Sequence, residues 1–268
     1  MGSGIILAAV VVGMVGIVIG LLLGVAGQKL KVEVNETEVA VRECLPGNNC
    51  GGCGYPGCDG LAKAIAEGTA PVNACPVAGA AGAKAIGEIM GVEAEETEQM
   101  VAFVRCSGTC ENIKTKYTYY GTADCKQAFF TPGRSEFICN YGCMGYGTCV
   151  KACRFDAIHV VNGIARVDRE KCRACGMCVE ACPNHLIELV PYASKYLVQC
   201  FSKDKGKAVK AGCNAGCIGC TLCTRVCETG AITVENNLAH IDPAKCTGCG
   251  KCAEKCPVKV IRLQECAD

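Results

Sequence analysis

The first thirty positions have a hydrophobic pattern unlike that of the rest of the chain. Residues 5–26 read IILAAVVVGMVGIVIGLLLGVA and contain no charged residue and no proline. These 22 residues are long enough to cross a bilayer as one helix. The first basic residues, Lys29 and Lys31, follow directly and predict a single-pass anchor with a large cytoplasmic C-terminal part. A cleaved signal peptide fits poorly, because no basic segment precedes this long apolar run.

Small residues are spaced regularly within this apolar run. Gly16, Gly20 and Gly24 recur every four residues, so they lie on one face of a helix. Such a face lets another membrane helix approach closely. Packing on an integral membrane protein of the same complex is one interpretation, and the general abundance of glycine in membrane helices is the other.

Beyond the apolar run, the pattern predicts short helices and short strands. Residues 61–70 (LAKAIAEGTA) read as a helix, and residues 77–104 as an alanine-rich helix with an acidic solvated stretch at 93–98. The segments AITVE at 231–235 and AHID at 239–242 read as short strands. We therefore expect an α+β protein.

Cysteine dominates the composition, with 27 among 268 residues. The count is odd, the chain is long for a disulfide scaffold, and many cysteines are too closely spaced to be cross-linked without strain. The three histidines stand outside the cysteine runs, and no Cys-x-x-Cys is followed by His, which argues against c-type haem. Runs of four cysteines within eleven residues favour iron–sulfur clusters over zinc.

The charge excludes one class of function. Basic and acidic residues number 27 and 26, so the formal net charge is +1. This balance provides no electrostatic footprint for nucleic acid.

A first group of cysteines lies in a glycine-rich segment. Cys50, Cys53, Cys58 and Cys75 have the spacing C-x2-C-x4-C-x16-C. The surrounding glycines allow the backbone to fold tightly around a cluster and to point N–H groups at its sulfurs. We expect one [4Fe–4S] cluster here, with a zinc site as the alternative.

An internal repeat of 74 residues organises the second half of the chain. The cysteines at 143, 149, 153, 172, 175, 178 and 182 recur at 217, 223, 227, 246, 249, 252 and 256. The surroundings recur too, since ARVDREKC at 165–172 matches AHIDPAKC at 239–246. The chain therefore contains two related modules of the two-cluster bacterial ferredoxin type.

Repeat two has the regular ferredoxin pattern, in which the fourth cysteine of each run ligates the other cluster. One cluster is expected on Cys217, Cys220, Cys223 and Cys256, and its neighbour on Cys246, Cys249, Cys252 and Cys227. Cys213 competes with Cys220 for the first cluster, and the standard spacing favours Cys220.

Repeat one departs from this pattern in its first run. Tyr146 stands where the middle ligand would fall, and a phenol does not replace a thiolate here. If that site is a four-cysteine cluster, Cys139 must substitute. The two expected sets are then Cys139, Cys143, Cys149 and Cys182, and Cys172, Cys175, Cys178 and Cys153.

Twenty cysteines are thereby assigned to five [4Fe–4S] clusters. The unassigned ones are Cys44, Cys106, Cys110, Cys125, Cys200, Cys213 and Cys266. A sixth metal site near Cys106, Cys110 and Cys125 is the less favoured interpretation, because only three thiols are close in sequence. Buried or free thiols are the alternative.

The segment between the repeats is basic. Its lysines outnumber its single aspartate and could steer an acidic redox partner, or they could simply belong to a solvated linker. They are Lys195, Lys203, Lys205, Lys207 and Lys210.

Taken together, these motifs resemble a known family. A glycine-spaced apolar helix, then C-x2-C-x4-C-x16-C, then CNYGCMGYGTCVKAC and a ferredoxin repeat resembles the RnfB family, the B subunits of Rnf complexes. The resemblance covers essentially the whole chain. The irregular run at 139–153 and the first module are its most specific parts.

The resemblance implies an electron-entry subunit of an ion-translocating ferredoxin:NAD+ oxidoreductase. Reduced soluble ferredoxin would be the donor, and the flavin- and NAD-binding and integral membrane subunits would be the partners, in a bacterial or archaeal plasma membrane. The residues themselves show no dinucleotide fingerprint and no catalytic arrangement. A polyferredoxin subunit of another membrane reductase or hydrogenase, and a zinc-binding scaffold, are the alternatives.

The expected domains correspond to these motifs. They are an anchor at 1–30, the four-cysteine module with a helical segment at 31–104, a cysteine-containing linker at 105–138, and ferredoxin-like domains at 139–195 and 196–268.

Overall fold

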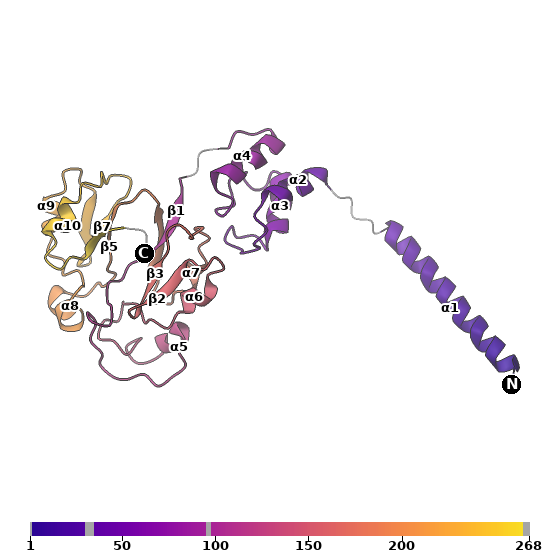
Figure 1. Ribbon diagram of the computed structural model, residues 1–268, viewed down its shortest axis with the longest axis horizontal. Helices are drawn as coiled ribbons and strands as arrows, with labels where there is room; N and C mark the ends of the chain where they lie inside the picture. The colour runs from indigo at the N-terminus through magenta and orange to yellow at the C-terminus, as the bar shows by residue number, and fades with distance from the viewer. Residues whose placement is uncertain (1, 30–34, 95–97, 265–268) are drawn as a thin grey trace.

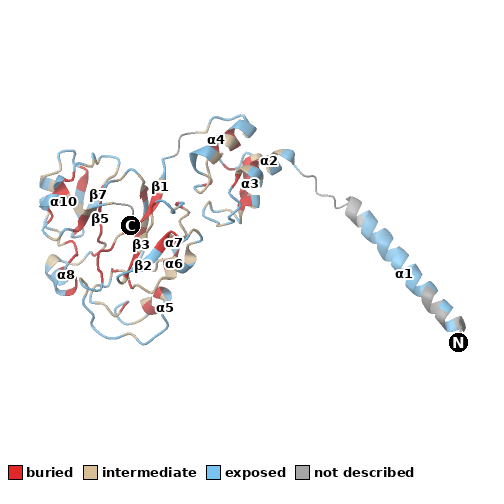
Figure 2. Ribbon diagram, viewed as in Figure 1, coloured by how far each residue is buried: buried red, intermediate tan, exposed pale blue. Residues whose placement is uncertain are grey.

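The computed structural model describes residues 2–29, 35–94 and 98–264. Helix α1, Gly2–Lys29, contains the apolar run, so the prediction of a helix there is confirmed. Its described side chains, at positions 4, 6 and 10–25, are exposed (Figure 2). Among the residues that the structure describes, no helix combines the length and the apolar character needed to cross a membrane.

Three helices form the first globular unit (Figure 1): α2, Glu36–Cys44, α3, Cys58–Ala66, and α4, Gly79–Met90. The predicted helix after Cys58 is thus confirmed. Helix α2 begins where the Asn35 side chain accepts a 3.0 Å hydrogen bond from the N–H of Thr37. The core of this unit comes from one face of each helix and includes Val41, Leu61 and Ile86, all 0% exposed.

The next element is a strand, which corrects the helix predicted through residue 104. Strand β1, Met100–Val104, pairs antiparallel with β4, Ile187–Pro191. The sequence MVAFV is rich in β-branched and aromatic side chains, and four of its five positions are buried. Its partner lies more than 80 positions away, so only the tertiary fold makes the strand stable.

The first ferredoxin-like module contains a hairpin of β2, Ile158–Val161, and β3, Ile164–Val167. Helix α6, Thr148–Ala152, precedes the hairpin and α7, Met177–Ala181, follows it. The segment before α6 contains α5, Cys125–Phe129. Helices α6 and α7 each begin one residue before a cysteine, and α5 begins on one, which places thiols at their first turns.

The second module repeats these elements 74 positions later, as the sequence predicted. Its hairpin is β6, Ile232–Glu235, with β7, Leu238–Ile241. The helices corresponding to α6 and α7 are α9, Leu222–Arg225, and α10, Lys251–Lys255. Helix α8, Gly206–Gly212, precedes the module.

The second module also has its own incoming strand. Strand β5, Tyr196–Val198, pairs antiparallel with β8, Ile261–Leu263, as β1 pairs with β4. The described residues thus form four two-stranded sheets, two in each module. The α+β class and the two ferredoxin-like units agree with the sequence prediction.

Candidate metal centres

Cysteine side chains form part of the core in every globular unit. Cys58 and Cys75 are buried in the first unit, Cys149 and Cys178 in the second, and Cys223 in the third. In the part of the chain that the structure describes, no three His, Cys, Asp or Glu side chains are grouped so that they could hold one metal ion. In an iron–sulfur cluster, by contrast, each thiolate binds its own iron.

The regular site of the second module groups the four thiols of one predicted set. Cys217, Cys220, Cys223 and Cys256 line one cavity of about 20 Å³, and Pro257 lies at its wall. Burial and the neighbouring Cys217, Cys220 and Cys256 thiols raise the pKa of Cys223 to about 11. The structure therefore brings the four thiols of the predicted crossed set together, and Cys220 lines this cavity whereas Cys213 lines another.

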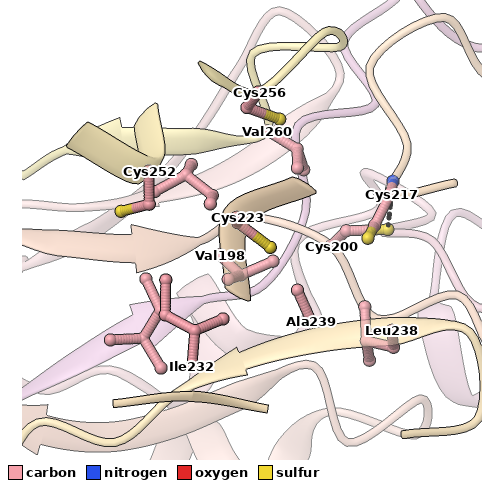
Figure 3. Packing of buried hydrophobic residues seen from close by; sticks show 12 residues of the cluster. Val198, Cys200, Cys217, Cys223, Ile232, Leu238, Ala239, Cys252, Cys256 and Val260 are labelled. Carbon is pink, nitrogen blue, oxygen red and sulfur yellow. Dashed lines mark hydrogen bonds between the residues drawn. The ribbon is translucent and has the colours of Figure 1, made fainter. Parts of the chain in front are cut away.

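The second set of this module lies on the other side of the core. Burial, together with Cys246 and Cys249, raises the pKa of Cys252. Cys227 and Cys246 pack against the same hydrophobic core. Figure 3 shows the sulfurs of Cys223 and Cys256 pointing to one side of this core and that of Cys252 pointing to the other.

The regular run of the first module is also brought together as predicted. Burial, followed by the like charges of Cys172, Cys175 and Cys153, raises the pKa of Cys178 to about 12. Backbone N–H groups point at these sulfurs. That of Ala102 donates to Cys172 Sγ at 3.4 Å, and that of Ala157 donates to Cys153 Sγ at 3.5 Å.

The irregular site of this module differs from its expected membership. One cavity of about 20 Å³ is lined by Cys143, Cys149, Cys182 and Cys125. Burial raises the pKa of Cys149 to about 12, with further contributions from Cys143, Cys125 and Cys182. Cys139, which we expected here, lines a different cavity. The structure thus puts Cys125 where the sequence suggested Cys139.

Local hydrogen bonds hold Cys125 in this position. Asp124 caps helix α5, since its Oδ1 accepts the N–H of Lys126 at 2.9 Å. The Thr148 hydroxyl donates to Asp124 Oδ2 at 3.1 Å and accepts the N–H of Cys125 at 2.8 Å. Because Thr148 also precedes Cys149, one side chain ties the distant Cys125 to the ferredoxin run.

Tyr146, which occupies the standard ligand position, takes part in a different interaction. Its hydroxyl donates to Glu136 Oε1 at 3.1 Å, and its ring lies 5.6 Å from that of Tyr119. Burial, followed by the Glu136 hydrogen bond and charge, raises the pKa of Tyr146. The phenol therefore stays protonated and packs against the small core that contains Cys125 and Met144.

The first globular unit brings most of its predicted set together. Burial raises the pKa of Cys75, and the Cys53 and Cys58 thiols raise it further. The N–H of Cys58 is held by Asn49 Oδ1 at 2.8 Å, which shapes the glycine-rich loop. Cys50, in the same loop, is near enough to Cys175 of the ferredoxin module to raise the pKa of Cys175.

The remaining cysteines are distributed among several environments. Cys125 and Cys106 lie in separate cavities, and Cys110 is exposed, so the structure does not form the group of Cys106, Cys110 and Cys125 considered from the sequence. Cys44 packs against the core of the first unit. Cys266 lies outside the described residues.

The basic segment between the modules presents its lysines to solvent. Helix α8 contains Lys207 and Lys210, and Lys205 caps it. Lys203 lies over the Phe201 ring at 5.6 Å. These four lysines and Lys195 are all exposed, so the surface is positively charged around α8.

Family models match three parts of the chain. Residues 45–77 match a model described as "Putative Fe-S cluster", which spans the glycine-rich loop and Cys75. Residues 165–188 match a 4Fe-4S binding domain, and residues 216–260 match a 4Fe-4S dicluster domain. The matched segments contain the cysteines at 50–75, 172–182 and 217–256, whereas Cys125, Cys143, Cys149 and Cys153 lie outside them.

Curated relatives match nearly the whole chain. The B subunit of the Na(+)-translocating ferredoxin:NAD(+) oxidoreductase complex of Acetobacterium woodii is 46% identical over 94% of this chain and 75% of the relative. The B subunit of the ion-translocating oxidoreductase complex of Methanosarcina acetivorans is 44% identical over 98% of this chain and 100% of the relative. The B subunit of the proton-translocating ferredoxin:NAD(+) oxidoreductase complex of Clostridium ljungdahlii is 39% identical, with 96% and 92% covered. This chain belongs to the RnfB family, the B subunits of ion-translocating oxidoreductase complexes.

Proposed function

We propose that this chain is the electron-transfer subunit of a membrane-bound, ion-translocating ferredoxin:NAD+ oxidoreductase. It takes electrons from reduced soluble ferredoxin and relays them to flavin- and NAD-binding and integral membrane subunits. The observation that carries this proposal is the cavity lined by Cys217, Cys220, Cys223 and Cys256, within a segment that matches a dicluster domain. Relatives named as B subunits of such complexes match the chain over nearly its full length.

Five groups of thiols support five [4Fe–4S] clusters. A cluster of this type takes up or gives away one electron with little rearrangement. Cys125 replaces Cys139 in the proposed set of the irregular site. The five sets are 50/53/58/75, 125/143/149/182, 153/172/175/178, 217/220/223/256 and 227/246/249/252.

The chain's own groups prepare these sites in two ways. Backbone N–H groups donate to the sulfurs, as Leu186 does to Cys182 at 3.4 Å and Ala165 does to Cys143 at 3.5 Å, which stabilises negative charge on the thiolates. Apolar side chains such as Ile164 and Ile187 exclude water from the same region. Both effects adjust the reduction potential of a bound cluster.

The first unit is proposed to exchange electrons with the first ferredoxin module. Its glycine-rich loop runs against Cys175, since a Cβ added at Gly52 would lie 2.3 Å from the Cys175 carbonyl oxygen. Arg154 donates hydrogen bonds of 2.9 Å to the carbonyl oxygens of Asn48 and Asn49. The set at 50/53/58/75 therefore neighbours the set at 153/172/175/178.

Helix α1 is proposed as a single-pass anchor that leaves the cluster modules in the cytoplasm. The apolar run at 5–26 supports this proposal because it is long enough to cross a bilayer. The structure does not describe the side chains of some residues in this run. Lysines directly after the run favour a cytoplasmic location for the cluster-bearing part of the chain. The glycine face at 16, 20 and 24 is proposed to pack on a helix of another subunit.

The lysines around α8 are proposed to steer reduced ferredoxin toward the chain. They form an exposed basic surface beside the second ferredoxin module, and a ferredoxin with an acidic surface would be attracted to it. A solvated surface without a docking role is the alternative. Reversing the charge of these lysines separates the two, because only a docking surface would affect the rate of reduction by ferredoxin.

The test starts with the full chain, purified in detergent without oxygen. At least about twenty irons and as many acid-labile sulfides per chain are expected, and reduced ferredoxin should bleach their visible absorption. A colourless chain loaded with zinc would overturn the proposal in favour of a zinc-binding scaffold. Iron-loaded protein that co-purifies with a hydrogenase or a quinone reductase would instead identify a polyferredoxin of another membrane enzyme.

A single substitution then tests the revised ligand set. Cys125→Ala should remove about four irons, while Cys110→Ser, which changes an exposed thiol on the same segment, should remove none. Full iron content in the Cys125→Ala protein would restore Cys139 as the candidate ligand.

A further inference from the structure

Four cysteines that lie outside the five proposed sets line one cavity. They are Cys106, Cys139, Cys200 and Cys213, and the cavity measures about 140 Å³. Cys106, Cys200 and Cys213 are each no more than 8% exposed, and Cys139 is half-buried. They come from segments up to 107 positions apart, so the tertiary fold alone brings them together.

The four residues follow the internal symmetry of the chain. Cys106 stands two positions after the last residue of β1, and Cys200 stands two positions after the last residue of β5. Cys139 and Cys213 are related by the 74-residue repeat. Each ferredoxin module thus provides one thiol after its incoming strand and one thiol before its first cysteine run, and the two pairs meet between the modules.

Backbone N–H groups point at these sulfurs in the same manner as at the regular sites. Cys106 Sγ accepts from the N–H groups of Gly108 and Cys143, each at 3.4 Å. Cys200 Sγ accepts from the N–H of Cys217 at 3.3 Å, as Figure 3 shows. These distances match that from Leu186 N to Cys182 Sγ, 3.4 Å. Such donors stabilise thiolates.

The donors also connect the cavity to a cluster site in each module. Cys143 belongs to the set 125/143/149/182, and Cys217 belongs to the set 217/220/223/256. A single hydrogen bond therefore joins the new group of thiols to a proposed cluster ligand in each module, Cys143 in the first and Cys217 in the second.

Space and charge distinguish this group from ordinary buried thiols. The cavity is larger than the one of about 20 Å³ at the regular ferredoxin site, so it has at least as much room for a cluster. All four cysteines are free thiols. Cys106, Cys200 and Cys213 are buried, so thiolates in this cavity would need a compensating positive charge, which iron supplies.

We propose that Cys106, Cys139, Cys200 and Cys213 hold a sixth [4Fe–4S] cluster between the two ferredoxin modules. Four thiolates in one buried cavity are the ligand set that such a cluster takes. The four cysteines would hold the cluster between the modules, where it would supply a one-electron carrier between their neighbouring cluster sites. The inference rests on the proposed function in that the chain must load clusters at its other sites.

The test compares single variants of the full chain, all purified without oxygen. Cys213→Ser and Cys139→Ser each remove one proposed ligand, and Cys110→Ser is the matched control because its thiol is exposed and outside the cavity. Iron, acid-labile sulfide and zinc are counted per chain. A reductive titration then measures how many electrons each chain accepts.

We expect about twenty-four irons and sulfides in the parent chain and in the control, and about twenty in both ligand variants. The electron count should fall by about one in the same two variants. The retained irons at the other sites would show that these variants are folded.

Two results would overturn the sixth cluster while leaving the proposed function intact. One is a parent chain with about twenty irons that neither ligand variant lowers. The other is zinc lost in place of iron. A parent chain without iron at any site would instead overturn the proposed function itself.

Discussion

Arg154 Nη1 donates a 2.9 Å hydrogen bond to the carbonyl oxygen of Asn49, 105 positions away in the chain. Arg154 follows Cys153, where the ferredoxin run ordinarily has a proline. A proline there would only shape the local turn, whereas the guanidinium reaches the glycine-rich loop of the first unit. The corresponding residue of the second module, Glu228, pairs instead with Lys251. The same departure from the ferredoxin pattern thus has a different use in each module.

Replacing Arg154 should loosen the docking of the glycine-rich loop. In Arg154→Ala the carbonyls of Asn48 and Asn49 lose their donor. We expect the free energy that holds the loop in place to fall by about 1 kcal/mol, so amide hydrogen exchange in residues 48–54 should become roughly fivefold faster. Lys151→Ala removes one positive charge nearby and should leave exchange unchanged. Equal exchange in the two variants would show that Arg154 does not hold the loop.

The close approach of Gly52 to Cys175 leads to a second prediction. In Gly52→Ala the new Cβ would lie 2.3 Å from the Cys175 carbonyl oxygen, so the loop must move away. The magnetic coupling between the reduced clusters of the two neighbouring sites should therefore weaken in electron paramagnetic resonance spectra. Asn48→Ala, which keeps the carbonyl bound by Arg154, should retain the parent spectrum. An unaltered spectrum in the Gly52 variant would contradict this contact.

Charge reversal tests the basic surface around α8. We expect Lys203, Lys205 and Lys207 changed together to Glu to slow reduction by ferredoxin about tenfold at low ionic strength. The difference should vanish at high salt, because screening removes the attraction. Stopped-flow absorbance measures the rate. Reversal of Lys126, Lys151 and Lys245, which are exposed and lie outside the basic segment, is the control for net charge. Equal rates in the two variants would favour the solvated surface.

The glycine face of α1 can be tested in the assembled complex. Beyond its own helix backbone, a Cβ at Gly20 would meet no atom of the described residues within 4 Å, so Gly20→Leu should leave the chain itself intact. It should abolish close packing on a neighbouring membrane helix and release the chain from its complex, yet leave it in the membrane fraction. Val18→Leu, on another face of the helix, should keep the complex together. Co-purification of the Gly20 variant at the parent level would exclude this face as an interface.

The local elements were largely predictable from the sequence. The helix after Cys58 and the strands at 231–235 and 239–242 were confirmed, because their patterns repeat over short distances. The helix predicted through residue 104 was wrong at Met100–Val104. Those residues become a strand through pairing with Ile187–Pro191, and no short-range pattern reports a partner so far along the chain.

The irregular site likewise depends on a residue that is distant in the sequence and that short-range patterns did not identify. The missing ligand at Tyr146 was visible in the sequence, and Cys139 was the nearest candidate. The structure places Cys125 there through Thr148 and Asp124, in a segment without a counterpart in the repeat. The sequence did show unassigned cysteines upstream of this run, which was a signal that one of them could be the missing ligand. Their spacing alone did not indicate which one.

The sequence by itself determined the chemistry and the modular plan. Two-residue spacings between thiols are local, and a 74-residue repeat is evident without coordinates, so the ferredoxin modules could be predicted directly and crossed ligand sets proposed for them. Only the tertiary structure decided which distant thiols meet, as Cys125 does with Cys143 and Cys106 does with Cys213. The physical reason is that strand pairing and helix capping position these residues, and both depend on partners that sequence distance does not reveal.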